Sequence, residues 1–217
     1  MKVKTSMGIG TKISIQLMAL LAVVLVGMLA YIIVTTVKTS TEAEYMNIAA
    51  LSDKNALLAQ GILEQSLDKA VALADILKGY EGIEPKTRRE TINNVMKSMV
   101  QADGSILGMW TCWEPNALDG MDASYAGTGQ SDGAGRFIPY WVWVDGSVET
   151  MPLVDYDKPG LGDYYLLARN SGETSILEPY EYEINGKKVL LTSMAVPIKE
   201  GNGKVVGVAG VDITLEA

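Results

Sequence analysis

The 217-residue chain has no histidine, and its one cysteine is Cys112. Without histidine, neither Ser-His-Asp nor Cys-His catalysis is available, and the commonest zinc ligand sets are excluded. A single cysteine cannot form an internal disulfide, and we expect Cys112 to be a small apolar residue of a strand. The sequence therefore predicts that the chain is not an enzyme and holds no metal or cofactor.

Basic residues are outnumbered by acidic ones. Lys and Arg total 18, Asp and Glu total 26, and the net charge is −8. A nucleic-acid partner would need a basic face, so this balance argues against one and is compatible with a cationic or zwitterionic ligand. Hydrophobic residues make up 48% of the chain and charged residues 20%, which is typical of a globular protein and not of a disordered one.

No charged residue occurs between Ile13 and Val37. A helix of about 20 apolar residues spans the hydrocarbon core of a bilayer and satisfies its backbone groups internally. Residues 13–37 are therefore predicted to cross the membrane once. Three lysines precede this run and two glutamates follow it closely. The positive-inside rule then places residues 1–12 in the cytoplasm and the rest of the chain outside.

A cleaved signal peptide is the alternative for this run. Its apolar region would be about 7–15 residues long and would end at a small-x-small cleavage site. The run is longer, and its exit, "YIIVTTVK", is a poor cleavage site. We therefore expect an uncleaved anchor in the plasma (inner) membrane, with the following domain periplasmic or extracellular.

Proline is absent from residues 39–78, and glycine occurs there once. Apolar residues recur three or four positions apart, which is the pattern of one helix face. We expect a long stalk helix over residues 39–78 that packs against the domain after it. Its apolar face consists of Ala56, Ala59, Leu63, Leu67, Ala70, Ala74 and Leu77. A break at "GYEGIEP" precedes a second predicted helix, "PKTRRETINNVMKSMVQA".

Short apolar runs separated by turn signals follow, and they predict strands. The runs are "ILGMWTCW", "GRFIPYWVWV", "SVETMPLV", "TSILEPYEYEI", "KKVLLTSMAVPI" and "KVVGVAGVDITL". Hairpin turns are expected at residues 145–146, 185–186 and 201–203, and the last two join three strands into an antiparallel meander. A short helix, "LGDYYLLARN", is expected between strands. The fold class is therefore α+β with one central antiparallel sheet.

Large aromatic residues are concentrated in "GRFIPYWVWVDG", residues 135–146, which includes the one phenylalanine of the chain. Successive side chains of a strand point to opposite faces, so this window cannot form a single aromatic cage. We expect Phe137, Trp141 and Trp143 to pack against the long helix. The other face carries Tyr140 and Arg136, and we expect it to line a ligand cleft.

An ordered set of segments resembles the double-Cache extracellular sensing domain of bacterial transmembrane receptors: "WEPNALDGMD", "GRFIPYW", "GDYYLLARNSG", "EPYEYEINGKKVLLTSMAVPI" and "GVAGVDITL". The resemblance covers the chain from about residue 39 onward. It implies that residues 79–217 form a membrane-distal, PAS-like module that binds a small organic ligand. It also implies a homodimer, which the apolar face of the stalk helix would serve.

The opening, "MGIGTKISIQL", resembles that of methyl-accepting chemotaxis receptors. The resemblance implies that a membrane-proximal module, a second transmembrane helix and a cytoplasmic output domain follow. We therefore expect the chain to be the N-terminal part of a longer receptor that reaches its cytoplasmic signalling partners through those domains. The alternative is the sensor region of a histidine kinase or a cyclic-dinucleotide enzyme, and nothing in this sequence separates the two.

Amino-acid-binding members of the family share a motif of Tyr, four residues, Arg, one residue and Trp-Tyr. In this chain the aromatic doublet falls on Tyr164 and Tyr165, while the Arg position holds Gly162 and the first Tyr position holds Asp157. The arginine would clamp a carboxylate with two parallel hydrogen bonds, and glycine cannot. Arg136 could supply the missing cation from another strand, which would again allow carboxylate ligands.

The family motif continues with Tyr-x-Asp and a late Asp. Here the first becomes Tyr180-Glu181-Tyr182, whereas the late residue is kept as Asp212. Asp212 lies between apolar residues of a strand expected to be buried, and a buried carboxylate requires a partner. That partner could be a backbone turn, but the resemblance favours an ammonium or another donor of a ligand enclosed by aromatic rings.

The predicted ligand is therefore a small amine, an amino-acid-like molecule or a purine-like ring. Tyr180 and Tyr182 share a strand face with Glu178, which suits either a pocket or an exposed sheet edge. The candidate ligand-binding residues are Trp110, Arg136, Tyr140, Tyr164, Tyr165, Tyr182 and Asp212.

Two acids in "NALDGMD", Asp119 and Asp122, could suggest a metal loop. The alternating acids and final glutamate of a calcium loop are absent, so we expect a turn or a pocket lid instead. A membrane-tethered extracellular enzyme would have to use a carboxylate pair, and no pair stands out. Turnover that depended on either of these acids would favour that alternative.

Overall fold

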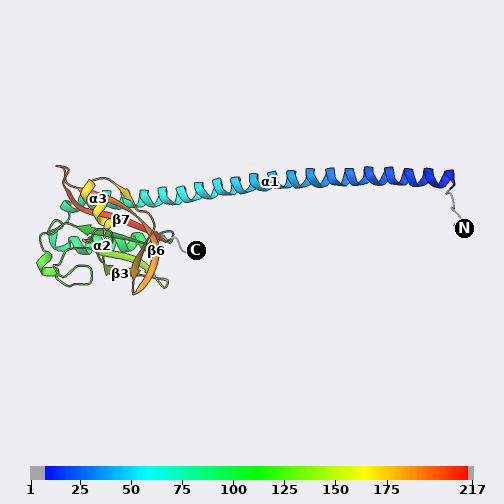
Figure 1. The fold of residues 1–217 in the computed structure, drawn as a ribbon. Helices are drawn as coiled ribbons and strands as arrows, with labels where there is room; N and C mark the ends of the chain where they lie inside the picture. Colours follow the sequence, from blue (N-terminus) through cyan, green and yellow to red (C-terminus); the bar gives the residue numbers. More distant parts are fainter. Residues whose placement is uncertain (1–7, 215–217) are drawn as a thin grey trace. The chain divides into compact units, whose positions relative to one another are not determined.

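The computed structural model describes residues 8–214, and the chain divides after Ala59 into two compact units. The first described element, α1 (Ile9–Lys78), is one uninterrupted helix (Figure 1). The expected membrane anchor and stalk are thus parts of a single helix. Among the described residues, this helix is the one long and apolar enough to cross a membrane. Lys2 and Lys4 of the expected cytoplasmic segment lie outside those residues.

The second unit, which we call the sheet module, begins at Gln60 and contains the last turns of α1. Those turns bury Ala70, Leu73, Ala74 and Leu77. A short 3₁₀ turn, η1 (Gly79–Gly82), leads into α2 (Pro85–Ala102), as the sequence predicted. Proline suits the first turn of α2 because the missing N–H would have no helical partner there. The N-terminal part of the predicted apolar face, Ala56 and Ala59, is exposed.

Seven strands form one antiparallel sheet in the sheet module, in the order β3-β2-β1-β7-β6-β4, with β5 also paired to β6. The strands are β1 (Gly108–Trp113), β2 (Pro139–Val144), β3 (Ser147–Pro152), β4 (Ser175–Ile176), β5 (Tyr180–Ile184), β6 (Lys187–Lys199) and β7 (Val205–Thr214). The predicted α+β class, the β2–β3 hairpin and the β5–β6–β7 meander are confirmed.

The two faces of the sheet carry separate hydrophobic clusters, because side chains alternate along each strand. One cluster joins α1 and α2 to the odd-numbered positions of β2, including Trp141. The other joins α3 (Asp163–Ser171) to the even-numbered positions, including Tyr140. Phe137 and Trp143 lie on the helix side with Trp141, as predicted. Cys112 is a buried residue of β1, also as predicted, and burial raises the pKa of its thiol to about 12.

Two predicted strands are shorter than expected. The strand predicted from residue 135 begins at Pro139, because Gly135 has a φ of +86° and a Cβ there would overlap the Asp122 carbonyl. The preceding loop instead forms an isolated bridge between Ser131 and Phe137. The segment "TSILEPYEYEI" forms two strands, β4 and β5, that both pair with β6 and flank Pro179. Proline lacks the N–H that a continuous ladder would use.

Candidate functional site

Asp212 lies near the C-terminal end of β7, two residues before its last residue, and is 3% exposed. The β6–β7 register places Ser193 directly opposite Asp212, and its hydroxyl donates to Asp212 Oδ1 at 2.6 Å. Trp110 on β1 donates from Nε1 to the same oxygen at 2.9 Å. Three strands therefore meet at one carboxylate on the α3 side of the sheet.

Burial raises the pKa of the Asp212 carboxyl from 3.8 to about 6, although hydrogen bonds from Ser193 and Trp110 oppose the rise. The Tyr140 hydroxyl is buried without a hydrogen bond of normal geometry to any described residue. It nevertheless interacts with Asp212 closely enough to lower the pKa of that carboxyl. Burial, and then the Asp212 charge, raise the pKa of Tyr140 well above its ordinary value. The site is thus a buried acceptor surrounded by neutral donors.

Four aromatic side chains contact one another around this carboxylate. The Tyr164 ring centroid lies 5.2 Å from that of Trp110 and 5.6 Å from that of Tyr182. Tyr182 in turn meets Tyr140 edge to face at 5.9 Å. The structure therefore brings together five of the seven predicted site residues, and we call Trp110, Tyr140, Tyr164, Tyr182 and Asp212 the Asp212 cluster.

Sequence reasoning did not include two members of this region among the candidates. The Tyr180 and Ser193 hydroxyls lie 2.7 Å apart, and Ser193 continues the chain of hydrogen bonds to Asp212. Tyr180 shares a strand face with Tyr182, and this alternation could have added Tyr180 to the candidate residues. Ser193 could not be identified without the β6–β7 register.

A cavity of about 710 Å³ lies beside the Asp212 cluster, and Tyr182 lines it. Three acids also line it: Asp155, Glu181 and Glu183. Lys188, the one basic residue of the lining, pairs with Glu181 at 2.7 Å. The mouth of this cavity is therefore more acidic than basic, which favours a positively charged ligand.

Gly162, at the position where the family motif has arginine, lies in a tight turn. A Cβ there would approach the carbonyl oxygens of Asp155 and Tyr156 too closely, and the Gly162 N–H donates to the Lys158 carbonyl at 2.7 Å. A side chain at position 162 would thus require this loop to move. Position 162 therefore cannot clamp a carboxylate: glycine has no side chain to donate, and the tight backbone turn leaves no room for one.

Arg136 and Tyr165, the other two predicted site residues, lie in a separate polar cluster around Glu114. Arg136 Nη2 donates to Glu114 Oε1 at 3.2 Å and to the Tyr165 hydroxyl, which itself donates to Glu114. Arg169 adds a bond from Nη2 to Glu114 Oε2 at 2.9 Å. Arg136 therefore faces Glu114, and the structure does not bring it to Asp212.

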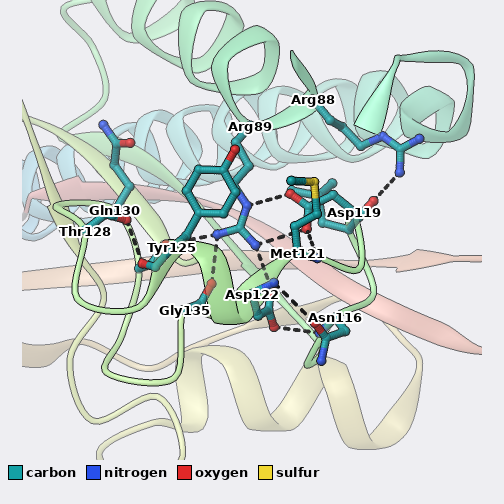
Figure 2. Close-up of polar contacts among 12 residues, drawn as sticks. Arg88, Arg89, Asn116, Asp119, Met121, Asp122, Tyr125, Thr128, Gln130 and Gly135 are labelled. Carbon is teal, nitrogen blue, oxygen red and sulfur yellow. Dashed lines mark hydrogen bonds and ion pairs between the residues drawn. The ribbon is translucent and has the colours of Figure 1, made fainter. Parts of the chain in front are cut away.

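The acids of "NALDGMD" surround Arg89 of α2 (Figure 2). Arg89 Nε donates to Asp119 Oδ2 at 2.7 Å, and Nη2 donates to Asp122 Oδ1 at 2.6 Å. The remaining guanidinium hydrogens bond Asp119 Oδ1, the Ser131 hydroxyl and the Gly135 carbonyl. The predicted turn is confirmed, because the Met121 N–H donates to Asp119. Residues 8–214 contain no group of acids, cysteines or histidines that could hold a metal ion.

Comparisons with known proteins give a consistent picture. The family model for the "methyl-accepting chemotaxis protein-like, first PDC sensor domain" matches residues 92–217. The methyl-accepting chemotaxis protein TlpQ of Pseudomonas aeruginosa is 31% identical over 140 residues, which are 58% of this chain and 19% of that protein. The chain thus spans about a fifth of that relative.

Two solved structures resemble the fold. The "extracellular domain of the putative histidine kinase mmHK1S-Z3" gives a TM-score of 0.63 at 31% identity, covering 70% of this chain and 52% of that one. Methyl-accepting chemotaxis protein X gives a TM-score of 0.57 at 28% identity, covering 71% of this chain and 56% of that one. The likeness therefore covers most of this chain and about half of each solved domain.

Proposed function

The chain belongs to the family of methyl-accepting chemotaxis protein-like first PDC sensor domains, and from this premise we propose that it is the sensing part of a transmembrane chemotaxis receptor. In the proposed topology residues 1–12 are cytoplasmic, residues 13–37 cross the plasma membrane once, and the sheet module lies outside. The uncharged run of α1 and the lysines before it support this orientation.

The proposed ligand is a small molecule rich in hydrogen-bond donors: an amine, an amino-acid-like molecule or a purine-like ring. The observation that carries this proposal is the Asp212 carboxylate, buried among aromatic rings. Both Ser193 and Trp110 donate to Oδ1, so Oδ2 is the oxygen proposed for the ligand's donor. Aromatic faces also attract cations, which adds to the attraction of the carboxylate.

We propose that the ligand enters from the cavity that Tyr182 lines. Asp212 is nearly fully buried, so neighbouring side chains must move to admit a ligand, and we propose that Tyr180 and Tyr182 do so. These rings meet edge to face at 6.4 Å and join β5 to the core of the module. Ligand binding would therefore change the packing between β5 and α3. Such a change can signal only if the two receptor states bind the ligand with different affinity.

A thermal-shift screen of the full chain in nanodiscs tests the ligand class, using amines, amino acids, purines and organic acids. A ligand at 100 times its dissociation constant adds about 2.7 kcal/mol of stability. We expect donor-rich compounds to raise the melting temperature of the wild-type chain and of Asp145→Ala, an exposed-acid control. We expect Asp212→Ala to show no ligand-induced shift. Shifts produced only by dicarboxylates and retained in Asp212→Ala would contradict the proposal.

The second candidate is the sensor of a histidine kinase, and the likeness to mmHK1S-Z3 favours it specifically. The two candidates share the same module and differ in the cytoplasmic domain. Sequencing the complete gene distinguishes them, because a chemotaxis receptor continues into a long methylatable coiled coil and a kinase into a catalytic domain.

We also propose that two copies pair through α1. Several large apolar residues of its stalk portion are exposed in the single chain, among them Tyr45, Ile48, Leu51 and Leu58. Cysteine crosslinking along residues 45–58 in membranes tests this pairing. Crosslinks with a three- and four-residue period support it, because that period marks one helix face. Uniform or absent crosslinking contradicts it.

A further inference from the structure

A second hollow lies in the sheet module, on the α2 side of the sheet. It has a volume of about 420 Å³ and lies between α2 and the loop that precedes β2. Six of its lining residues matter here, and we call the hollow the α2 groove: Lys86, Asn94, Lys97, Tyr125, Gln130 and Trp141. The sheet separates this groove from Asp212, because Trp141 and Tyr140 point to opposite faces of β2.

The wall of the α2 groove is held by a fixed set of hydrogen bonds. Asn93 of α2 accepts from Trp141 Nε1 at 2.9 Å and donates to Gln130 Oε1 at 3.1 Å. Arg89 lies 4.1 Å from the Tyr125 ring centroid, and all of its N–H groups are already bonded (Figure 2). Arg89 therefore orders the groove and has no donor left for a ligand.

Other polar groups of the groove remain available. Three side-chain groups make no hydrogen bond to any residue within 8–214: Gln130 Nε2, the side-chain amide of Asn94 and the Lys97 ammonium. Lys97 Nζ lies 5.6 Å from the Trp141 ring centroid. Asn94 and Lys97 are three residues apart on α2, so they lie on the same helix face. One end of the groove thus presents donors beside an aromatic ring.

The lining of the groove includes two lysines, Lys86 and Lys97, and one acid, Glu90, besides Arg89. Helix α2 carries Lys86, Arg88, Arg89 and Lys97 against one acid, Glu90. Asp119 and Asp122 both pair with Arg89 and exceed its charge by one, whereas Arg88, outside the groove lining, donates only to carbonyl oxygens, including that of Ile83 at 2.7 Å. Lys97 lies seven residues from Glu90, about 10 Å along α2, and forms no ion pair within residues 8–214. The positive charge of the groove is therefore local to its Lys97 end, where it attracts an anion.

We propose that the α2 groove is a second binding site, for a small organic carboxylate with a flat apolar body. Lys97, Gln130 and Asn94 hold the carboxylate, and the apolar body packs on Trp141 and Tyr125. Donors outnumber acceptors at this end of the groove, which selects an anion over an amine. This proposal is independent of the ligand that binds at Asp212.

Benzoate and its neutral isostere benzamide test the site, with the full chain in nanodiscs. The measurement is the position of the Trp141 indole N–H signal in nuclear magnetic resonance spectra, identified with Trp141→Phe. We expect saturable movement with benzoate at about 1 mM, the affinity range of small fragments, and none with benzamide. Sodium chloride weakens the benzoate response, because the lysine is exposed to solvent.

Variants locate the carboxylate. Lys97→Gln removes a charged hydrogen bond and is expected to weaken benzoate about tenfold. Lys86→Gln is the matched control in the same groove, because its position lies about 16 Å along the helix from Lys97 and beyond the screening length. We expect Lys86→Gln to change the affinity for benzoate less than twofold. Asp212→Ala leaves benzoate binding unchanged. Equal responses to benzoate and benzamide, loss in Asp212→Ala, or an unchanged affinity in Lys97→Gln would overturn the proposal.

Discussion

Gly210 on β7 lies directly opposite Trp110 on β1, and a Cβ atom at Gly210 would overlap the Trp110 indole ring. The missing side chain therefore lets the indole lie across β7. From there its Nε1 reaches Asp212 Oδ1, two residues farther along the strand. The geometry of the Asp212 cluster thus depends on a glycine that makes no polar side-chain contact of its own.

Gly210→Ala is expected to displace Trp110 and to lower the free energy of unfolding by about 1–3 kcal/mol, the usual effect of overpacking a core. The indole would then lose its bond to Asp212, so amine binding should weaken as well. Thermal unfolding followed by tryptophan fluorescence measures the loss of stability, and ligand titration measures the loss of affinity. The control is Gly201→Ala, where a Cβ meets nothing within 4 Å. A melting temperature equal to that of the control would show that the cluster tolerates a side chain there.

Asp212→Asn is expected to stabilise the unliganded chain at neutral pH. Burial raises the folded-state pKa of Asp212 from 3.8 to about 6, so the folded state holds this proton more tightly than the unfolded state. The stability from that proton is present below pH 3.8 and is lost as the pH rises through about 6. The ionised residue then costs about 3 kcal/mol, which asparagine avoids. Melting temperatures should favour Asp212→Asn at pH 8 and converge with wild type near pH 4.

The affinity for an amine at Asp212 should increase as the pH rises, whereas the stability of the unliganded chain decreases. A protonated amine is attracted by the ionised carboxylate, which dominates above the pKa of about 6. The affinity is therefore expected to be constant from about pH 7 to 8 and to fall about tenfold for each pH unit below 6. Titration calorimetry at several pH values, with the best amine from the thermal-shift screen, measures this. An affinity that stays flat down to pH 5 would mean that Asp212 does not meet the ligand's charge.

Glu114→Gln tests whether the polar cluster around Glu114 supports the Asp212 cluster. Burial opposes ionisation of Glu114, but hydrogen bonds from Arg169 and Tyr165 outweigh it and lower the pKa of the carboxyl. Its stabilising effect is therefore present at neutral pH and is lost as the pH falls through that lowered pKa. We expect the variant to lose about 1–3 kcal/mol at pH 7, the usual cost of a lost charged hydrogen bond.

The same substitution should also weaken amine binding, because Tyr165 directly follows Tyr164 of the Asp212 cluster on α3. Ligand titrations of the folded variant measure this second effect. Glu173→Gln is the matched control, because Glu173 is exposed and lies two residues after the last residue of α3. Unchanged amine affinity in a destabilised Glu114→Gln variant would limit the role of Glu114 to stability.

Periodicity predicted the helices and most of the strands, because those elements depend on local pattern and burial. The predicted start of β2 was wrong, because the chain turns at Gly135, which has a φ of +86° and no room for a Cβ beside the Asp122 carbonyl. Asp122 is thirteen residues away, so no local pattern reports this proximity. The split of β4 from β5 could have been predicted from Pro179, which cannot continue a ladder.

Those features of the Asp212 cluster that depend on adjacent residues in the sequence could be predicted. Apolar residues on both sides predicted the burial of Asp212. Its donors, Trp110 and Ser193, come from strands whose pairing depends on the whole sheet. The side chain of Arg136 lies on the predicted side of the sheet. Arg136 precedes the first residue of β2, however, and its side chain bonds Glu114 and not Asp212. Alternation gives the face of a side chain but not its position along the sheet.

Arg89→Met is expected to destabilise the sheet module strongly. Arg89 pairs with Asp119 and Asp122, and the side chains of all three are at most 9% exposed. Removing the cation leaves two buried carboxylates with backbone N–H donors but no charged partner, which costs about 3–5 kcal/mol. The matched control is Lys158→Met, whose pair with Asp155 is 63% and 39% exposed and is worth at most about 1 kcal/mol. Thermal unfolding of both variants gives the comparison. A loss in Arg89→Met no larger than in the control would show that the loop before β2 is held by its hydrophobic contacts and not by this buried arginine.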